Sequence, residues 1–408
     1  MDDLYQLSQT YLRLFDRPYV RNFLREKPFE NRMTVLLGQR GIGKTTVLIQ
    51  YLREFAKDDV KSEKILYLPA DHFQIKGRAI YEIAEDFLKY GGQLICFDEI
   101  HKYANWSQEL KSIYDTFPDL KVIASGSSAL EIYKGSHDLS RRAIKRQLPG
   151  LSFREYLEVS LDVTFEFYPL GEILKKHGVI GEKIVDVLKK KRLKILPLFK
   201  KYLIEGYYPM VIELDSKETF LITLEQNIHT SIESDLLSAN PSLSGESIVK
   251  IKRLLVYLSQ QTPFKVDIAK IQRALSITDS RTIKTYLQLL ENAGCIQMLY
   301  HQNKNLNGFE KPEKIYLENT NQIYALGGNH ADLGNIRETF FVNATSKKYE
   351  IFYSEQGDFV VEGATFEVGG KGKTFRQIKG IENSFLALDE VESGINKKIP
   401  LWLFGFLY

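Results

Sequence analysis

Short apolar runs alternate with amphipathic stretches in the N-terminal part of the chain. The runs predict buried strands, because they lack a polar face and end at glycine or at carboxylates. The stretches between them repeat apolar residues every three or four positions, which predicts helices. The predicted strands are residues 33–37, 64–68, 94–97 and 121–124, and the predicted helices are residues 45–55, 79–89 and 106–114. This alternation predicts an α/β fold with a parallel sheet, whose ligands bind at the carboxyl ends of the strands.

The alternation ends near residue 150, and other patterns follow. Residues 151–240 have mostly helical spacing. Three helical stretches and an apolar strand then occur in the order of a winged helix, at 248–258, 267–275, 279–292 and 294–300. Short β-rich runs follow at 314–317, 349–353, 358–361, 365–368 and 400–407. We therefore predict a core over residues 1–150, a helical lid and connector over 151–245, a winged helix over 246–310 and an α+β domain over 311–408.

Composition and charge narrow the class of protein. The 408 residues are 44% hydrophobic and 26% charged, which excludes wholesale disorder. A net charge of +3 excludes a globally basic nucleic-acid coat protein and an acidic solvating chain. The small total hides a basic segment at 161–204, an acidic one at 205–250 and a basic one at 251–302. Nucleic-acid contact in the middle of the chain stays open, and so does pairing of the acidic segment with its basic neighbours.

The cysteines and the termini predict a cellular compartment. Cys96 and Cys295 are the two cysteines and lie far apart, so we expect no disulfide framework and no zinc cluster. The N-terminus has neither the basic nor the apolar region of a signal peptide. The longest apolar run, residues 399–408, is shorter than the about 18 residues that cross a bilayer and predicts a buried terminal strand. We expect a cytoplasmic protein with no membrane partner.

The segment after the first predicted strand has the spacing G-x-x-x-x-G-K-[ST]. Its glycines let successive backbone N–H groups point at phosphate oxygens, and the next helix adds its positive N-terminus. Lys44 is predicted to bridge the β- and γ-phosphates and Thr45 to bind Mg²⁺; the alternative is a glycine-rich turn that binds nothing. The predicted nucleotide-binding residues of this Walker A-type loop are Gly38, Gln39, Arg40, Gly41, Ile42, Gly43, Lys44, Thr45 and Thr46.

A second acidic motif ends the strand predicted at 94–97. Asp98 and Glu99 follow four apolar residues, so the strand delivers both carboxylates to the edge of the sheet where the glycine-rich loop lies. Asp98 is predicted to hold Mg²⁺ and Glu99 to polarise the attacking water. Carboxylates also cap strands without any catalytic role, but the glycine-rich loop that precedes this motif favours the functional interpretation.

Two further positions are candidates around the γ-phosphate. Ser125 and Ser127 follow the strand at 121–124, where either hydroxyl could contact the γ-phosphate or the attacking water. The alternative is that one of them caps the next helix. Arg141 lies in a basic segment and is predicted to neutralise transition-state charge, within one chain or across a subunit boundary. The alternative is that this segment is a solvated basic face.

These motifs resemble prokaryotic AAA+/STAND-like P-loop ATPases. The resemblance is carried by Gly-Gln-Arg-Gly-Ile-Gly-Lys-Thr-Thr, by Phe-Asp-Glu-Ile-His with Trp106 soon after, and by Ser-Gly-Ser-Ser. It extends through residues 140–156, 205–209 and 311–316, with Ser140 where the family has glycine before the arginine. It implies an ATPase core that binds ATP and Mg²⁺, a helical lid, a winged helix and a C-terminal domain similar to restriction endonucleases.

The C-terminal segment departs from a working nuclease. Such enzymes use one carboxylate and then an acid-x-Lys strand to hold Mg²⁺ and orient water. Asp358 and Glu367 supply the acids, and Glu338 is a further carboxylate, but Gly369 stands where the lysine is required. Lys371 lies two residues too late. We therefore predict an inactive domain that keeps the fold as a binding or assembly surface.

Three functions are compatible with this sequence. The first is a Mg²⁺-dependent ATPase that acts as a nucleotide-driven conformational switch, with self-association or a protein partner left open. The second is a DNA-binding regulator that uses Ser280, Arg281, Thr282 and Lys284 at the start of the third winged-helix helix. The third is a helicase, suggested by the D-E-x-H run, and it ranks last because no second motor-type α/β domain follows.

Overall fold

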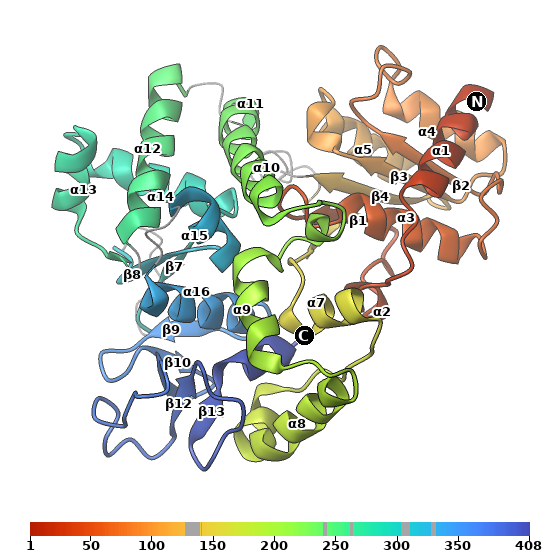
Figure 1. Cartoon of the computed structure of the whole chain (residues 1–408). Helices are drawn as coiled ribbons and strands as arrows, with labels where there is room; N and C mark the ends of the chain where they lie inside the picture. The colour runs from red at the N-terminus through yellow and green to blue at the C-terminus, as the bar shows by residue number, and fades with distance from the viewer. Residues whose placement is uncertain (127–138, 140, 240–242, 262–263, 303–310, 328–331) are drawn as a thin grey trace. The chain divides into compact units, whose positions relative to one another are not determined.

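The computed structural model divides the chain into two compact units (Figure 1). It describes residues 1–408 except 127–138, 140, 240–242, 262–263, 303–310 and 328–331. The first unit contains Met1–Pro149 and Thr230–Leu243, and the second contains Gly150–His229 and Ser244–Tyr408.

The first unit is built on a five-stranded parallel sheet, which confirms the predicted α/β class. The strand order is β2-β3-β4-β1-β5. Every residue of β1, β2 and β3 is buried, as expected when helices cover both faces of a parallel sheet. The strands are β1 (Met33–Leu37), β2 (Ile65–Pro69), β3 (Leu94–Asp98), β4 (Lys121–Gly126) and β5 (Ile144–Gln147). The sequence pattern missed β5, an edge strand whose four residues are all exposed.

The helices of the first unit follow the predicted order. Amphipathic helices α3, α4 and α5 begin within one residue of the predicted starts. The N-terminal helix α1 packs on the edge strand β2, where Ser8 Oγ accepts a hydrogen bond from Tyr67 N at 2.9 Å. The helical elements are α1 (Asp2–Leu14), α2 (Asn22–Arg25), α3 (Lys44–Phe55), α4 (Ile80–Lys89), the 3₁₀ turn η1 (Ile100–Lys102) and α5 (Trp106–Thr116).

Helices dominate the chain from residue 153 to residue 239, as the spacing predicts. Ser152 caps α7 by accepting a hydrogen bond from Glu155 N, and Glu155 returns the contact to Ser152 N. The helical elements are α7 (Phe153–Leu161), α8 (Leu170–Lys190), α9 (Ile195–Glu205), η2 (Pro209–Ile212), α10 (Lys217–Thr230), the π-helical turn η3 (Ser231–Asp235) and α11 (Leu236–Ala239).

The next part of the second unit combines three helices with three short strands. Strand β8 lies between β6 and β7 and is antiparallel to both. This pairing crosses the domain boundary expected at residue 310, so the hairpin belongs with the helices before it. The elements are α12 (Gly245–Gln261), β6 (Phe264–Lys265), α13 (Ile268–Leu275), α14 (Ser280–Asn292), β7 (Ile296–Leu299) and β8 (Lys314–Leu317).

The C-terminal part combines two helices with a mixed five-stranded sheet. The strand order is β13-β12-β11-β10-β9, with β9, β10 and β11 antiparallel and β11, β12 and β13 parallel. Helix α16 packs on β11, and the sheet lies below it in Figure 1. The elements are α15 (Thr320–Gly327), α16 (Leu333–Ser346), β9 (Ile351–Tyr353), β10 (Phe359–Val361), β11 (Ala364–Gly369), β12 (Ser384–Leu388) and β13 (Lys398–Pro400).

The buried apolar segment at the end of the chain corrects one prediction. We expected a strand over residues 400–407, but Leu401–Phe406 forms a 3₁₀ helix, η5, after the short β13. A Cβ on Gly405 would lie 2.5 Å from Phe153 Cβ, so the segment packs closely against α7. An apolar run without polar interruptions has no period, and burial alone does not distinguish a strand from a helix.

Across the described residues, no helix is both long and apolar enough to span a membrane.

Candidate functional site

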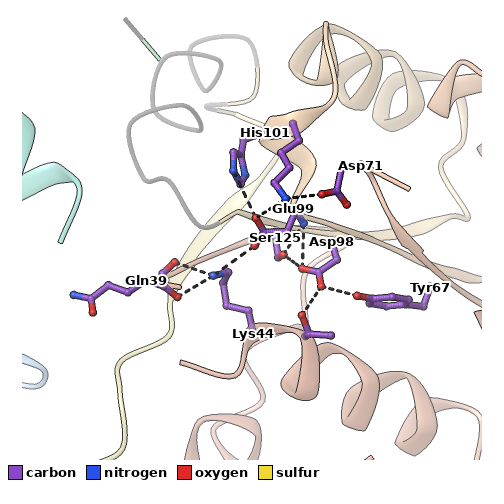
Figure 2. A network of polar contacts seen from close by, with 11 residues as sticks. Gln39, Lys44, Tyr67, Asp71, Asp98, Glu99, His101 and Ser125 are labelled. Carbon is purple, nitrogen blue, oxygen red and sulfur yellow. Dashed lines mark hydrogen bonds and ion pairs between the residues drawn. The ribbon is translucent and has the colours of Figure 1, made fainter. Parts of the chain in front are cut away.

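The candidate site lies where three neighbouring strands of the first sheet end (Figure 2). Strand β1 ends one residue before Gly38, β3 ends at Asp98, and β4 contains Ser125. Because β4 pairs with both β1 and β3, the parallel register brings these three ends to one edge. The sequence prediction that the glycine-rich loop and the acidic motif converge is therefore confirmed.

The glycine-rich loop has the backbone conformation that its glycines allow. Gly41 and Gly43 have φ angles of 80° and 89°, in the left-handed region that side chains disfavour. A Cβ on Gly38 would lie 2.4 Å from Ile42 Cδ1 and 2.9 Å from Leu148 O, so this position also requires glycine. The loop leads directly into α3, which begins at Lys44. A curled backbone followed by a helix N-terminus is suited to binding a phosphate group.

Lys44 is buried beside this loop. Its side chain is 5% exposed, and Nζ donates hydrogen bonds to Gly38 O and Gln39 O, each at 3.0 Å. Nζ also lies 3.9 Å from Glu99 Oε1. A buried ammonium group that contacts the loop backbone and a carboxylate is placed to meet phosphate oxygens bound by the loop.

Asp98 is the centre of the polar network in Figure 2. Its Oδ2 accepts hydrogen bonds from Thr45 Oγ1 and from Tyr67 Oη, each at 2.6 Å. Its Oδ1 accepts hydrogen bonds from Ser125 Oγ and, at 3.1 Å, from Glu99 N. Asp98 is only 3% exposed, so these donors compensate the burial of its carboxylate.

The donor set at Thr45 and Asp98 fits Mg²⁺. This ion prefers hard oxygen ligands and usually takes one or two protein oxygens together with phosphates and water. The hydroxyl and the carboxylate in contact here are both of that kind. Within the described residues, no group of three or more His, Cys, Asp or Glu side chains is arranged to hold a metal.

Glu99 follows Asp98 in an unusual backbone conformation. Its φ of 53° is left-handed, a conformation that costs free energy for a residue with a side chain and is common at functional sites. Oε2 lies 3.7 Å from His101 Nε2 and 3.8 Å from Lys102 Nζ. Burial alone would raise the pKa of Glu99, but the positive charges of Lys44, His101, Lys102 and Arg40 lower it below the ordinary value. The carboxylate is thus held in its ionised form.

Three further residues, Ser125, Ser127 and Arg141, are predicted to act at the γ-phosphate. Ser125 is fully buried, and its hydroxyl donates to Asp98 and accepts from Glu99 N at 3.2 Å, so its described contacts brace the acidic motif. Ser127 lies outside the described residues. Arg141 is exposed, while its neighbour Arg142 forms hydrogen bonds with both carboxylate oxygens of Asp115 at 2.7 and 2.9 Å. The roles assigned to Ser125, Ser127 and Arg141 stay predictions.

The rest of the predicted loop residues lie around the same backbone. Gln39 supplies a carbonyl to Lys44, Ile42 is buried, and the charge of Arg40 acts on Glu99. Thr46 is half-buried in the first turn of α3.

Sequence reasoning missed two residues that contact the site. Tyr67 is in an apolar strand, where its ring is indistinguishable from core, yet its hydroxyl contacts Asp98. Burial and the charge of Asp98 raise the pKa of Tyr67, so the phenol stays protonated. Arg21 is buried before the sheet begins, and its Nη1 donates to Ile42 O at 3.3 Å and to Pro149 O at 2.9 Å. The sequence signals of these two contacts are weak: a polar atom in an apolar strand, and an arginine just before a short helix.

The family models match two parts of the chain. Residues 30–157 match the model of an AAA domain, and this match contains the loop and both acidic residues. Most of this matched segment lies in the first unit, which is therefore similar to an AAA domain. Residues 196–331 match the model of a domain of unknown function (DUF8612), which includes the motifs at 205–209 and 311–316.

Two relatives are similar over most of this chain. An uncharacterised protein of Methanocaldococcus jannaschii is 25% identical over 307 residues, which is 71% of this chain and 62% of that protein. An uncharacterised protein of Haemophilus influenzae is 24% identical over 349 residues, which is 81% of this chain and 79% of that protein. The chain therefore spans less than two thirds of the length of the archaeal relative.

Two solved structures are similar to this chain at lower sequence identity. A Walker-type ATPase of Pyrococcus abyssi is 13% identical with a TM-score of 0.43, over 77% of this chain and 96% of that one. AMPPCP-bound DnaA from Aquifex aeolicus is 16% identical with a TM-score of 0.24, over 70% of this chain and 86% of that one.

A second cluster of charged side chains lies in the C-terminal part of the second unit. Lys314 Nζ lies 3.0 Å from Glu338 Oε2 and 3.6 Å from Asp358 Oδ1, and Tyr316 Oη donates to Glu338 Oε2 at 2.6 Å. Burial and the charge of Asp358 raise the pKa of Glu338, although Lys314 opposes this shift. Two of the three carboxylates predicted from sequence therefore share one ammonium group.

The third carboxylate, Glu367, has a lysine partner that the sequence analysis did not consider. Gly369 does stand where a lysine was expected, and Lys371 is exposed beyond the strand. However, the side chain of Lys373 folds back over Gly369, where a Cβ would lie 3.0 Å from Lys373 Cγ, and Nζ pairs with Glu367 Oε1. The turn that closes with Lys373 N donating to Gly370 O allows this return, which strand spacing did not predict.

Proposed function

We propose that this chain is a Mg²⁺-dependent ATP-binding and ATP-hydrolysing protein that acts as a nucleotide-driven conformational switch. The observation that carries the proposal is the 2.6 Å hydrogen bond between Thr45 Oγ1 and Asp98 Oδ2, next to the Lys44–Glu99 pair. It joins the hydroxyl that follows the phosphate loop to the acid that ends the neighbouring strand. In P-loop NTPases, a hydroxyl and a carboxylate in these two positions hold one Mg²⁺ ion.

Each residue has a definite role in this proposal. The loop backbone and Lys44 bind the phosphates, and Thr45 and Asp98 hold Mg²⁺, which neutralises phosphate charge when bound. Glu99 orients the attacking water and accepts its proton. Ser125 fixes the two acids from the adjacent strand.

The exposed position of Arg141 supports a role on a neighbouring subunit. An arginine that reaches the γ-phosphate of an adjacent copy must lie on the surface, and Arg141 does. Ser127 remains the candidate sensor of the γ-phosphate. ATP is favoured over GTP by the AAA-like match, and no Asn-Lys-x-Asp run that reads guanine occurs in the sequence.

Phosphate release tests the proposal. Wild-type protein with ATP and Mg²⁺ releases phosphate, whereas addition of EDTA or the substitution Lys44→Ala abolishes the release. Lys61→Ala is the matched control, because Lys61 is an exposed lysine of the same unit, in the segment between α3 and β2. Equal rates for the wild type and Lys44→Ala contradict the proposal.

The element order of α12–β8 favours a second candidate, a DNA-binding regulator with ATP as a slow switch. Three helices with a strand after the first and a hairpin after the third have the order of a winged helix. Ile283, Tyr286, Leu287 and Leu290 are buried, and Ser280, Arg281 and Lys284 are exposed at the start of α14. A recognition helix contacts DNA through residues at its start, and exposed basic residues there can bind the phosphates.

For the C-terminal part we propose an inactive, nuclease-like fold that serves as a binding or assembly surface. The pairing of Lys314 with Glu338 and Asp358 supports this proposal. Ammonium groups neutralise the carboxylates that a nuclease would need for Mg²⁺.

A further inference from the structure

Tyr67 connects the acidic motif to the outer edge of the first sheet. It lies in the middle of β2, the edge strand, and its hydroxyl reaches the end of the neighbouring strand β3. The 2.6 Å bond to Asp98 Oδ2 is as short as the bond that Thr45 makes to the same oxygen. Figure 2 shows the ring of Tyr67 pointing at the carboxylate from the side opposite Lys44.

The hydrogen bonds to Asp98 leave its carboxylate little freedom to rotate. Ser125 Oγ and Glu99 N donate to Oδ1, and Thr45 and Tyr67 donate to Oδ2. Of these groups, Tyr67 alone comes from β2, outside the phosphate loop and the strands β3 and β4. Loss of its hydroxyl would leave Oδ2 with Thr45 and would fix the orientation of the carboxylate less tightly.

Helix α1 holds Tyr67 in place. Tyr67 N donates to Ser8 Oγ at 2.9 Å, and this bond is buried. The ring of Tyr67 lies against the ring of Tyr11, with their centroids 5.1 Å apart. Ser8 and Tyr11 precede residue 30, where the match to the AAA domain begins. A segment outside the matched domain thus fixes a side chain that contacts the acidic motif.

We propose that Tyr67 is a positioning residue for the Mg²⁺-binding pair Thr45 and Asp98, held in place by α1. This inference rests on the proposed function, because it assigns Tyr67 to the same site. The hydroxyl fixes the orientation of the Asp98 carboxylate, and it therefore affects the part of nucleotide affinity that Mg²⁺ supplies. The same hydroxyl also interacts with Thr45, the other member of the Mg²⁺-binding pair, so both of its polar contacts lie on the metal side of the site.

Binding of a fluorescent ATP analogue, measured in Mg²⁺ and in EDTA, separates these contributions without any turnover. We expect Tyr67→Phe to weaken binding in Mg²⁺ about tenfold, the size of one lost hydrogen bond to a charged group, and to leave binding in EDTA within about twofold of wild type. Tyr5→Phe is the matched control. Tyr5 lies on α1, like Ser8 and Tyr11, but its hydroxyl donates to Glu63 O and not to Asp98. Equal losses in both media, or no loss in Mg²⁺, overturn the inference.

A double-mutant cycle tests whether Tyr67 acts through Asp98. In an Asp98→Ala background, Tyr67→Phe has no further effect on the ratio of the two affinities. A further loss of similar size would overturn the inference, because the hydroxyl would then act elsewhere. Wild-type protein that binds the analogue equally in Mg²⁺ and EDTA, or not at all, contradicts the proposed function itself. Wild-type protein that binds more tightly in Mg²⁺, with Tyr67→Phe unchanged, contradicts only the role of Tyr67.

Discussion

Lys44 and Glu99 face each other across the phosphate loop, with Nζ 3.9 Å from Oε1. Lys44 begins α3 and Glu99 follows β3, so the fold brings together the phosphate-binding group and the proposed base from distant parts of the sequence. Phosphate bound by the loop would take Lys44 as its own partner. Glu99 would then keep His101 and Lys102 as its neighbours, at 3.7 and 3.8 Å.

Glu99→Gln separates nucleotide binding from hydrolysis. The amide keeps the shape of the side chain but cannot accept a proton from water, so we expect phosphate release to fall at least about a hundredfold. ATP affinity should stay within a few-fold of wild type, because the loop and Lys44 are unchanged. Rates of phosphate release and binding titrations check both parts. Equal hydrolysis by the variant and the wild type would show that Glu99 is not the base.

Arg21→Ala removes a side chain that contacts the backbone of the phosphate loop from a preceding segment of the chain. Arg21 Nη1 contacts Ile42 O within the loop and Pro149 O at the end of the first unit's N-terminal segment, and the side chain is buried. Its loss leaves two carbonyls without this charged donor, at a cost of about 1.5–3 kcal/mol per bond. We expect ATP affinity to fall about tenfold or more in a binding titration.

The control for this prediction is Arg25→Ala, which removes an exposed arginine of α2 from the same segment. Thermal unfolding of both variants shows whether the fold is kept. If Arg21→Ala binds ATP as tightly as Arg25→Ala does, the loop does not depend on this contact.

The sequence predicted the part of the fold that depends on burial and on local spacing. Strands β1 and β3 are buried throughout and mostly apolar because helices cover both faces of the sheet, and this pattern is visible without a structure. Strand β5 was missed because Ile144–Gln147 is exposed and mostly polar. Thus the sheet's centre was predictable from the pattern, and its exposed edge was not.

The site was predictable where residue type and spacing determine chemistry. Thr45 meets Asp98 and Lys44 meets Glu99 because a loop and a strand end have few ways to converge in a parallel sheet. The contacts of Tyr67 and Lys373 depend on which residues the tertiary fold places beside them, and the local spacing of residue types does not predict this.

Arg281→Ala combined with Lys284→Ala tests the DNA-binding candidate. Both side chains are exposed at the start of α14, whose first turn is capped by Asp279 accepting from Arg281 N at 2.9 Å. Removal of two phosphate-binding charges should weaken duplex retention at low salt about tenfold or more and reduce its salt dependence. Arg273→Ala with Lys270→Ala, a pair of exposed residues on α13, is the control. Unchanged retention by the α14 double variant excludes α14 as a DNA-binding surface.

The charged cluster of Glu338, Asp358 and Glu367 predicts no metal-dependent cleavage of DNA. Lys314 pairs with Glu338 and Asp358, so Mg²⁺ or Mn²⁺ bound at these two carboxylates would have to displace its ammonium group. We expect linear duplex and single-stranded DNA to remain intact with either ion. Cleavage by the wild type that disappears in Asp358→Ala would contradict an inactive domain.

Glu291 makes the stability of the second unit depend on pH. Burial raises its pKa above the ordinary 4.5, and the charge of Glu318 adds to this, although the hydrogen bond from Met298 N at 2.9 Å opposes it. The native state therefore binds this proton more tightly than the unfolded chain does. The contribution of Glu291 to stability falls as the pH rises through 4.5 and up to the native pKa, and it is constant above that.

Glu291→Gln should consequently be more stable than the wild type at neutral pH. Its amide oxygen can still accept the bond from Met298 N, and it carries no charge that burial penalises. The advantage should shrink to nothing as the pH falls below 4.5, where both the native and the unfolded wild type are protonated at this site. Urea unfolding midpoints at several pH values measure the difference, and Glu382→Gln, an exposed glutamate of the same unit, is the control. A stability gain that is independent of pH, or one equally large in Glu382→Gln, would show that the ionisation of Glu291 is not its source.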